Sequence, residues 1–545
     1  MTAPGAIVID NSVDTLIMSS AYISNEMRHE FGMLPPAFLP LGPNCAYERM
    51  REMHEISGPL FLTLPDDWAI SNFDKLRLEE QRITVIKLDK SLSLPDAIGK
   101  ALDVISSANP LTVIFGDTNI EIAPEDRKRT DVVAVSKTSA NHIWTYVDAN
   151  GSFISKLTAQ GIGNLKGVVC GYFCFSDKLA LKASLIQCRT FEDALNRYKE
   201  KIGLEVFAPK EWRDFGHLTN YFRSRKELLV SRAFNVIEVQ GDIVTKRSLD
   251  HEKLKAEYDW YTTLPPKLRL HTPRLMGFQE GSGHNPSRYN IEYMYLMSLS
   301  ELFVFGALPR LRWKQIMKST GDILQLFQDS PTEPLEEHMS RENLHQVLFE
   351  AKTWDRLEVF GETPAFPFET ELRVNGKIFP KIHVMAEEAI KLVSESAAGR
   401  VCLSHGDFFF GNMFFDSRCE RAMMIDPRGL VGVNTTQLGS QLYDIAKLCH
   451  SVYGNYDAIV ANRYRLTFNS NTDFDLDMHI RSNTKMVREL FNFEILDRFA
   501  VERNVALAAT VLLFLSMLPL HSECPMRQCA LVATAASLYS ELESI

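Results

Sequence analysis

The sequence lacks paired cysteines, a long apolar run and an excess of basic residues, and each absence excludes a class of protein. The nine cysteines include no CxxC pair, so neither a zinc site nor a disulfide framework is expected. The longest apolar run, residues 505–518, is interrupted by Thr510 and Ser516 and is too short to span a bilayer, so it predicts a buried helix and no membrane insertion. The net charge is −10, which argues against nucleic acid or an anionic membrane as a partner.

The N-terminus also lacks a basic segment followed by an apolar stretch, which is the pattern of a secretory signal. Together with the scattered cysteines, this predicts a cytoplasmic protein with reduced thiols. The hydrophobic content of 45% and the charged content of 23% are those of a folded globular protein. A chain of 545 residues is too long for one ordinary domain. We expect two domains, residues 1–207 and 208–545, because the rhythm of apolar runs changes between them.

The most informative stretch is residues 405–412, HGDFFFGN, followed by an apolar run that ends at Asp426. Phosphoryl transfer to a hydroxyl needs a carboxylate that accepts the proton, and oxygen ligands that hold Mg²⁺ on the nucleotide phosphates. Asp407, Asn412 and Asp426 have the types and the order that this chemistry requires. The plainer alternative is a turn in which Asp and Asn are caps, since both residues are common at turns.

These residues resemble the catalytic loop and the metal-binding Asp of the aminoglycoside phosphotransferase and choline kinase family, relatives of the protein kinases. The resemblance covers about residues 210–545. It implies a bilobal, protein-kinase-like α+β domain with ATP as the phosphoryl donor. It also implies that Asp407 is the catalytic base, that Asn412 and Asp426 bind Mg²⁺, and that Asp444 braces the catalytic loop.

Such a kinase domain needs a nucleotide-binding lobe upstream, which we expect at about residues 220–295, before a helical lobe at 296–545. Two strand-like runs, residues 227–230 and 236–239, flank a polar loop without a glycine cluster, and Ser231 and Arg232 of this loop are candidates for contact with the phosphates.

The next strand-like run carries Lys246, and Asp250 is placed to cap a helix that carries Glu257. Lys246 and Glu257 are the candidate ion pair that neutralises the phosphates, although each type of residue is usually solvated in such positions. A later strand-like run, residues 289–294, is the candidate hinge, whose main chain would bind adenine near Tyr293 and Met294.

The first half alternates short apolar runs with helical stretches, which predicts an α/β sandwich with a mostly parallel sheet. The expected strands are residues 6–9, 60–64, 83–88, 111–115, 132–135 and 168–175. Residues 148–151, DANG, predict a hairpin after Trp144.

Three landmarks in this half resemble the sugar nucleotidyltransferases of the GT-A-like fold: residues 40–42 (PLG), 115–118 (FGDT) and 171–173 (GYF). The resemblance implies that Asp117, at the end of its strand, binds Mg²⁺ on a nucleotide. A second metal carboxylate is not identifiable from the sequence. The sequence also departs from the family, because no glycine-rich segment follows the first strand and Pro35–Pro36 stand where a Pro-Lys pair is expected.

The two resemblances together predict a bifunctional enzyme of the kind linked to surface-polysaccharide biosynthesis. It would phosphorylate a small hydroxylated metabolite, such as a sugar, polyol or amino alcohol, with ATP and Mg²⁺. It would then couple the product to a nucleotide from CTP or UTP. One alternative keeps only the kinase, with an inactive first domain; the other is a nucleotide-binding scaffold without turnover. A homo-oligomer is left open.

Overall fold

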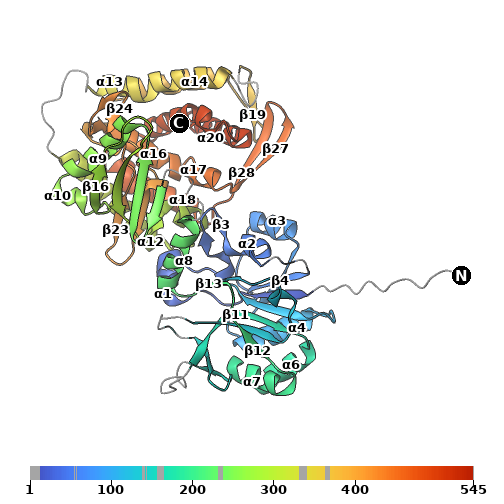
Figure 1. Ribbon diagram of the computed structural model, residues 1–545. Coiled ribbons are helices and arrows are strands. Elements are labelled where there is room, and N and C mark those ends of the chain that lie inside the picture. Colours follow the sequence, from blue (N-terminus) through green and yellow to red (C-terminus); the bar gives the residue numbers. More distant parts are fainter. Residues whose placement is uncertain are drawn as a thin grey trace. The chain divides into compact units, whose positions relative to one another are not determined.

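Internal contacts divide the chain into two units, Met1–Glu227 and Leu228–Ile545 (Figure 1). The computed structural model describes residues 13–543 apart from 55, 57, 138–141, 143, 156–164, 231–236, 331–339 and 363–368. Each unit is described by itself.

The first unit is built on a mixed sheet with helices packed against it. In the parallel part, β1 lies between β4 and β6, and β5 pairs with β4. The antiparallel part begins with β11, which pairs with β6, β8 and β9, and β12 adds to β8. The strands are β1 (Asp14–Met18), β4 (Leu60–Pro65), β5 (Ile83–Leu88), β6 (Leu111–Phe115), β8 (Val132–Ser136), β9 (Thr145–Asp148), β10 (Phe153–Ser155), β11 (Leu165–Phe175) and β12 (Glu205–Phe207).

Helices α4 (Leu94–Val104), α6 (Lys178–Gln187) and α7 (Phe191–Lys201) group together beside this sheet (Figure 1). Their apolar faces share one core with the sheet, in which Ile98 and Leu195 join Val113. Because apolar residues recur at helical spacing in the helices and in short runs in the strands, the two element types can bury one common interface.

The α/β fold predicted for the first half is confirmed. The five expected strands from residue 60 onward are present, and β9 and β10 form the predicted hairpin. The expected strand at 6–9 lies outside the described residues. The strand β1 was not predicted, because it begins at the buried acidic residue Asp14 and therefore does not read as an apolar run.

The segment after residue 207, which the sequence analysis assigned to the second domain, packs with the first unit. Strand β13 (Glu211–Asp214) pairs with β7 (Thr118–Glu121). Helix α8 (Leu218–Val230) follows, and its Tyr221 packs edge-to-face on Phe31 and donates a hydrogen bond to the carbonyl of Pro40. The strand predicted at 227–230 is wrong, since these residues are the last turn of α8; a four-residue apolar run fits a helix as well as a strand.

The second unit begins with a four-stranded antiparallel sheet in the order β14-β15-β17-β16. Helix α9 (His251–Thr263) packs on this sheet and starts at the predicted cap, where the Asp250 side chain accepts a hydrogen bond from the Lys253 N–H group. The strands are β14 (Ile237–Gln240), β15 (Ile243–Ser248), β16 (Leu275–Gln279) and β17 (Ser287–Glu292).

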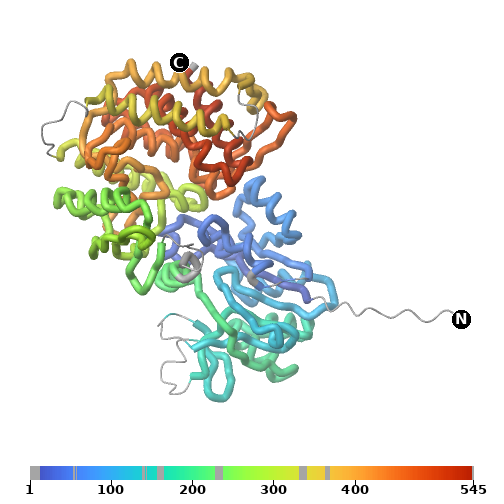
Figure 2. The backbone as a smooth tube through the Cα atoms, turned by 45° about the horizontal axis from the view of Figure 1, so that its top comes forward, coloured from blue at the N-terminus to red at the C-terminus, as the bar shows by residue number. Residues whose placement is uncertain are grey.

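The rest of the second unit is mainly helical. Its central helix, α19 (Arg503–Ser516), is buried over most of its length, as residues 505–518 predicted, and contacts α15, α16 and α20. Figure 2 follows this part of the chain from yellow to red. The main helices are α11 (Leu299–Phe305), α12 (Arg310–Asp329), α14 (Lys352–Glu362), α15 (Ile382–Glu395), α16 (Gln441–Val452), α18 (Thr484–Phe491), α19 and α20 (Pro525–Glu543).

Short strands in this helical part hold the segment that the sequence analysis singled out. Strand β21 (Val401–Leu403) pairs with β26 (Leu438–Ser440), and β22 (Met413–Asp416) pairs with β23 (Arg421–Met424). The HGD motif therefore lies between β21 and β22, and Asp426 lies just after β23. Both of the resulting loops are anchored at each end by a strand.

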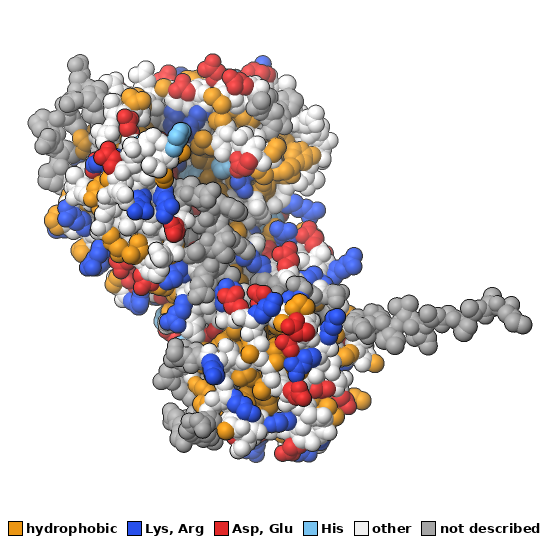
Figure 3. Space-filling model, viewed as in Figure 1, with side chains coloured by type: hydrophobic (Ala, Val, Ile, Leu, Met, Phe, Trp, Pro, Cys, Tyr) orange, Lys and Arg blue, Asp and Glu red, His pale blue; other side chains and the backbone are white. Residues whose placement is uncertain are grey.

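On the face drawn in Figure 3, acidic and basic side chains are interspersed rather than gathered in a basic patch. None of the described helices is both long enough and apolar enough to cross a membrane.

Candidate active sites

The backbone of the HGD loop is held by Asp444 of α16. One carboxylate oxygen of Asp444 accepts hydrogen bonds from the His405 N–H group and the Ser404 hydroxyl, both at 2.9 Å. The other accepts from the Gly406 N–H group at 2.8 Å. Burial raises the pKa of Asp444 to about 6, although these hydrogen bonds oppose the shift. The bracing role expected of Asp444 is confirmed.

Asp407 lies next to a buried lysine that the sequence analysis did not identify. Lys447, also on α16, places its Nζ atom 2.8 Å from Oδ1 of Asp407, and Asn412 Nδ2 lies 3.2 Å from Oδ2. Burial would raise the pKa of Asp407, but Lys447 and Arg428 hold it far below its usual range. The low pKa means that Asp407 is an ionised carboxylate. Because 27% of its side chain is exposed, a substrate can reach it.

Asn412 faces Asp407 through its amide nitrogen. No donor in the described part of the chain bonds its Oδ1 atom, which is the atom that a metal ion would take. The Asn412 carbonyl accepts a hydrogen bond from the Ile425 N–H group at 3.0 Å. This bond ties the HGD loop to the residue just before Asp426.

Lys246 of β15 and Glu257 of α9 form the predicted ion pair, with 2.7 Å between Nζ and Oε2. Lys246 Nζ also lies 3.4 Å from Oδ1 of Asp426, and the Tyr289 hydroxyl donates to Glu257 at 3.2 Å. Burial lowers the pKa of Lys246, but Asp426 and Glu257 outweigh it and the net shift is upward. The lysine is therefore charged and faces the carboxylate assigned to the metal.

Asp426 is held in a strained backbone conformation, with φ at 57°, and its N–H group donates to the Tyr261 hydroxyl. Gly429 follows at φ 62°, and a Cβ atom there would lie 2.2 Å from the carbonyl oxygen of Ala256. The loop after Asp426 thus contacts the backbone of α9 directly, at the residue before Glu257. The close contact brings Asp426 and the Lys246–Glu257 pair into one group.

The structure says less about the two remaining sets of predicted nucleotide-binding residues. Ser231 and Arg232 lie outside the described residues. Tyr293 and Met294 follow β17, where the Tyr293 N–H group donates to the Asp242 carbonyl at 2.8 Å and the Met294 carbonyl accepts from Leu296. That Tyr293 and Met294 bind adenine stays a prediction.

In the first unit, the structure brings a second carboxylate to Asp117. The Phe215 N–H group donates to the Asp117 carbonyl, and a Cβ atom at Gly216 would lie 2.6 Å from Asp117 Oδ2 and 3.3 Å from Asp214 Oδ1. Burial and then Asp214 raise the pKa of Asp117 to about 6. Two adjacent ionised carboxylates repel each other, and a divalent cation bound between them would relieve this repulsion.

Asp214 is itself fixed by its neighbours. Its Oδ2 lies 2.7 Å from His217 Nδ1 and accepts from the Asn220 side chain at 2.8 Å, and its Oδ1 accepts from the Gly216 N–H group at 2.9 Å. These contacts all come from the segment that ends β13 and starts α8. The carboxylate is therefore positioned before any ligand binds.

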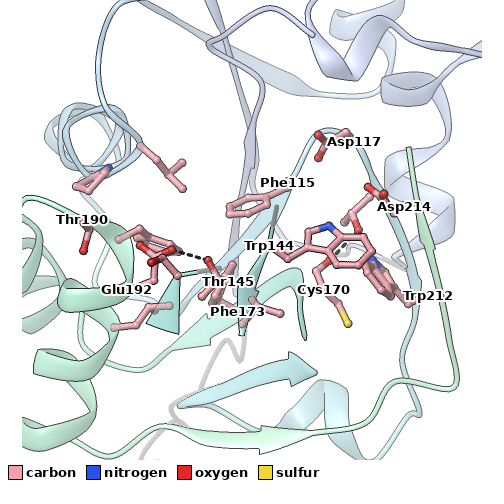
Figure 4. A pocket seen from close by; sticks show the side chains of 18 of the residues that line it. Phe115, Asp117, Trp144, Thr145, Cys170, Phe173, Thr190, Glu192, Trp212 and Asp214 are labelled. Atoms are coloured by element: carbon pink, nitrogen blue, oxygen red, sulfur yellow. Dashed lines mark hydrogen bonds between the residues drawn. The ribbon is translucent and has the colours of Figure 1, made fainter. Parts of the chain in front are cut away.

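The two carboxylates border a cavity of about 420 Å³ (Figure 4). Trp144 and Trp212 meet edge-to-face in its wall, and Trp212 donates to the Thr118 hydroxyl at 3.0 Å. At the opposite end in Figure 4, Glu192 accepts a hydrogen bond from Thr145 at 2.8 Å. The cavity combines aromatic walls with acidic groups, as binding sites for small polar molecules often do.

The segment after β1, where a triphosphate-binding loop was expected, is used internally. The Ser19 N–H group donates to the Thr63 hydroxyl at 2.8 Å, and the Ser19 hydroxyl accepts from the Ala37 N–H group at 3.0 Å. The ammonium group of Lys87, on β5, donates to the backbone carbonyl of Pro65 at 2.9 Å. Ser19 and Lys87 therefore bond to other parts of the first unit.

Sequence reasoning missed Asp214 and Lys447 for different reasons. Asp214 lies in a short polar strand and reaches Asp117 only because β13 pairs with β7, a contact between distant parts of the chain. Lys447 stands three residues after Asp444 on one helix, so helical spacing would have placed both beside the HGD loop.

No group of three or more His, Cys, Asp or Glu side chains among the described residues is arranged to hold a metal ion unaided. Both candidate sites instead offer two oxygen-bearing side chains each, Asn412 with Asp426 and Asp117 with Asp214. Such sites are typical of Mg²⁺ that arrives with nucleotide phosphates, which supply the remaining ligands.

Comparison with known proteins adds a family for the second unit. Residues 229–475 match the phosphotransferase enzyme family. A comparison with curated proteins gives no significant match.

Similar solved structures fall into two groups. A UDP-glucose pyrophosphorylase complexed with UDP-glucose is 13% identical, covering 41% of this chain and 100% of its own, with a TM-score of 0.31. An inositol-1-phosphate CTP transferase from T. maritima is 12% identical, covering 40% and 95%, with a TM-score of 0.33. An aminoglycoside phosphotransferase from Streptomyces rimosus, in complex with ADP and streptomycin, is 15% identical, covering 51% and 87%, with a TM-score of 0.31. With residues 229–475 matched to its family, the second unit carries a phosphotransferase domain.

Proposed function

We propose that the second unit transfers the γ-phosphoryl group of ATP to a hydroxyl group of a small molecule. The observation that carries the proposal is the contact between Asp407, Lys447 and Asn412 in a loop tied to Asp426, which itself meets the Lys246–Glu257 pair. One set of residues thus supplies a base, oxygen ligands for a metal and a charged lysine for phosphate, in the order that the sequence predicted.

In this mechanism Asp407 accepts the proton of the acceptor hydroxyl as its oxygen attacks the γ-phosphorus atom. The bond between that phosphorus and the β–γ bridging oxygen breaks, and ADP leaves. Lys246 stabilises negative charge on the phosphates, and Glu257 keeps it oriented. Asn412 and Asp426 would hold Mg²⁺, which when bound neutralises phosphate charge.

For the first unit we propose nucleotidyl transfer to the phosphorylated product, with CTP or UTP as the donor. The paired carboxylates Asp117 and Asp214 at the edge of the cavity support this, because they suit a Mg²⁺-bound nucleotide. The product would be a nucleotide-activated group for surface polysaccharide or lipid, made in the cytoplasm where nucleotides are available. Joining two consecutive steps in one chain raises the effective concentration of the intermediate.

A second candidate for the first unit is a binding domain without turnover. The observation in its favour is the internal use of Ser19 and Lys87, which leaves the phosphate-binding part of the site unlike that of the nucleotidyltransferases. In that case the chain is a kinase with an added domain for specificity or assembly.

Pyrophosphate release separates the two candidates. The intact chain is given ATP, Mg²⁺ and a panel of sugars, polyols and amino alcohols, and then each NTP in turn. We expect pyrophosphate only after the kinase product has formed, and we expect Asp117→Ala and Asp214→Ala to abolish its release while ADP formation continues. If the intact chain forms a phosphorylated product but never releases pyrophosphate, the first unit is not a nucleotidyltransferase.

A further inference from the structure

Four cationic side chains lie around Tyr443, and two of them, Arg428 and Lys447, also lie beside Asp407. Lys352 and Arg356 lie on α14, Arg428 follows β23, and Lys447 lies on α16. Within the described part of the chain, Lys447 is the only one of the four that forms an ion pair with a carboxylate, that of Asp407 at 2.8 Å. Such a concentration of one charge is unfavourable unless anions balance it.

Lys352 and Arg356 bond to uncharged or weakly acidic groups. Lys352 Nζ donates to the Tyr443 hydroxyl, and Arg356 donates to the backbone carbonyl of Ser516 at 2.9 Å. Burial would raise the pKa of Tyr443, but Lys352, Arg428 and Lys447 lower it to about 7. The three cations therefore act together on a single phenol group.

Arg428 has no hydrogen-bond or ion-pair partner for its guanidinium group among the described residues. Its aliphatic part lies against Gly406, since a Cβ atom at position 406 would be 3.0 Å from the Arg428 Cβ and 3.3 Å from its Cδ. This contact, together with the hydrogen bond from the Arg428 N–H group to the His405 carbonyl at 2.9 Å, places Arg428 beside Asp407. Burying part of a guanidinium group without a partner costs desolvation free energy. Such a group can bind a carboxylate or phosphate in a bidentate manner.

The nucleotide side of the same site differs in charge. There Lys246 is balanced by Glu257 and Asp426. Among the described residues of the site, the surplus of positive charge therefore lies where α14, α16 and the loop after Asp426 come together around Tyr443, next to Asp407.

We propose that the acceptor of the second unit carries, besides its hydroxyl group, a carboxylate or phosphate group that binds Arg428 and Lys352. The inference rests on the proposed kinase function and names the class of substrate. The anionic group fixes the acceptor so that its hydroxyl faces Asp407. An acceptor whose second group is a quaternary ammonium, as in choline, would be repelled by the same cluster.

Anion binding can be measured without turnover. The intact chain is first saturated with Mg²⁺ and a non-hydrolysable ATP analogue, and is then titrated by calorimetry with inorganic phosphate and, separately, with glycerate. We expect binding that weakens about tenfold or more in Arg428→Met and Lys352→Met. Lys391→Met, which removes an exposed cation from α15, should bind as the natural chain does. Arg428→Lys keeps the charge and should restore part of the affinity if the variants are folded.

Each outcome of the titration is decisive. Absence of anion binding to the natural chain, or equal binding by Arg428→Met, would overturn the proposal. Preference for phosphate over glycerate, or the reverse, identifies the anionic group. Failure of the ATP analogue to bind in the first step would instead overturn the kinase function and this inference with it.

Kinetics with matched acceptors tests the same inference by a second route. Glycerol is compared with glycerate and glycerol 1-phosphate, and we expect kcat/KM to be about tenfold or more higher for an anionic member. Arg428→Met should lose this preference through KM of the acceptor. If kcat falls equally for charged and uncharged acceptors with KM unchanged, Arg428 acts on the transferred phosphoryl group and the proposal is wrong. Equal turnover of glycerol and both anions also contradicts it, while leaving the kinase function intact.

Discussion

At the scale of single residues, the charge on Asp407 is the feature on which the proposed chemistry depends. A general base must be ionised, and a partly buried carboxylate such as this one would ordinarily bind a proton more readily than in water. The ammonium group of Lys447, 2.8 Å away, reverses that tendency. Lys447 is thus a positioning and charge-stabilising residue rather than a group that reacts.

Replacing Lys447 by Met should make the activity sensitive to acid. Without the cation, the pKa of Asp407 rises, so the base becomes protonated at a higher pH. As the pH falls, the variant should therefore lose kcat/KM earlier than the natural chain, which should keep its base ionised throughout the range from about 5 to 8. A pH–rate profile for ADP formation measures this. An acid limb at the same pH in both proteins would show that Lys447 does not control the base; Lys391→Met is the control for loss of a lysine.

At the scale of secondary-structure elements, the loop after Asp426 is fixed by its contact with α9. Gly429 has φ at 62° and leaves no room for a Cβ atom beside the carbonyl of Ala256. Gly432, in the same loop, has nearly the same φ, 59°, but its Cβ atom would meet only Val347, at 3.5 Å. Comparing an alanine substitution at Gly429 with one at Gly432 therefore separates the cost of backbone strain from the cost of a steric clash.

We expect Gly429→Ala to destabilise the second unit clearly more than Gly432→Ala. Gly432→Ala should cost about 1 kcal/mol of unfolding free energy, the usual effect of a left-handed backbone on a residue with a Cβ atom. Gly429→Ala adds a clash that α9 must move to relieve, and this should also weaken ATP binding because α9 carries Glu257. Urea unfolding and the KM for ATP test both effects. Equal stability of the two variants would mean that the contact with α9 is not needed.

The sequence predicted helices and strands well where a run of apolar residues was long enough to mark the element. The strands from Leu60 to Phe175 and the helix α19 were evident from apolar runs. The roles of Asp407, Asn412 and Asp426 were inferred from their chemical order and stay a prediction. The last turn of α8 was misread because a short apolar run carries no period. Asp214 could not be identified, since its meeting with Asp117 depends on the pairing of β13 with β7 and on no local pattern.

At the scale of the whole molecule, the chain divides into two units, and α8 up to Glu227 belongs with the first. A fragment of residues 1–230 should therefore unfold cooperatively, whereas a fragment of residues 1–207 should not. The shorter fragment lacks β13 and α8, so Phe31 loses Tyr221 and Asp117 loses Asp214. Circular dichroism during heating compares the two fragments. A cooperative transition at the same temperature in both would show that residues 208–230 are not part of the first unit's fold.

The central claim for the whole molecule is that the second unit is an ATP-dependent kinase whose base is Asp407. The most direct test is ADP formation, with acceptor and Mg²⁺, by the intact chain and by Asp407→Asn, which keeps the size of the side chain and removes its charge. We predict that the intact chain turns over and that the variant loses about 10²–10⁴-fold in kcat. ATP should still bind the variant, because Lys246 and Asp426 are unchanged. Turnover by Asp407→Asn at close to the rate of the natural chain would contradict the account.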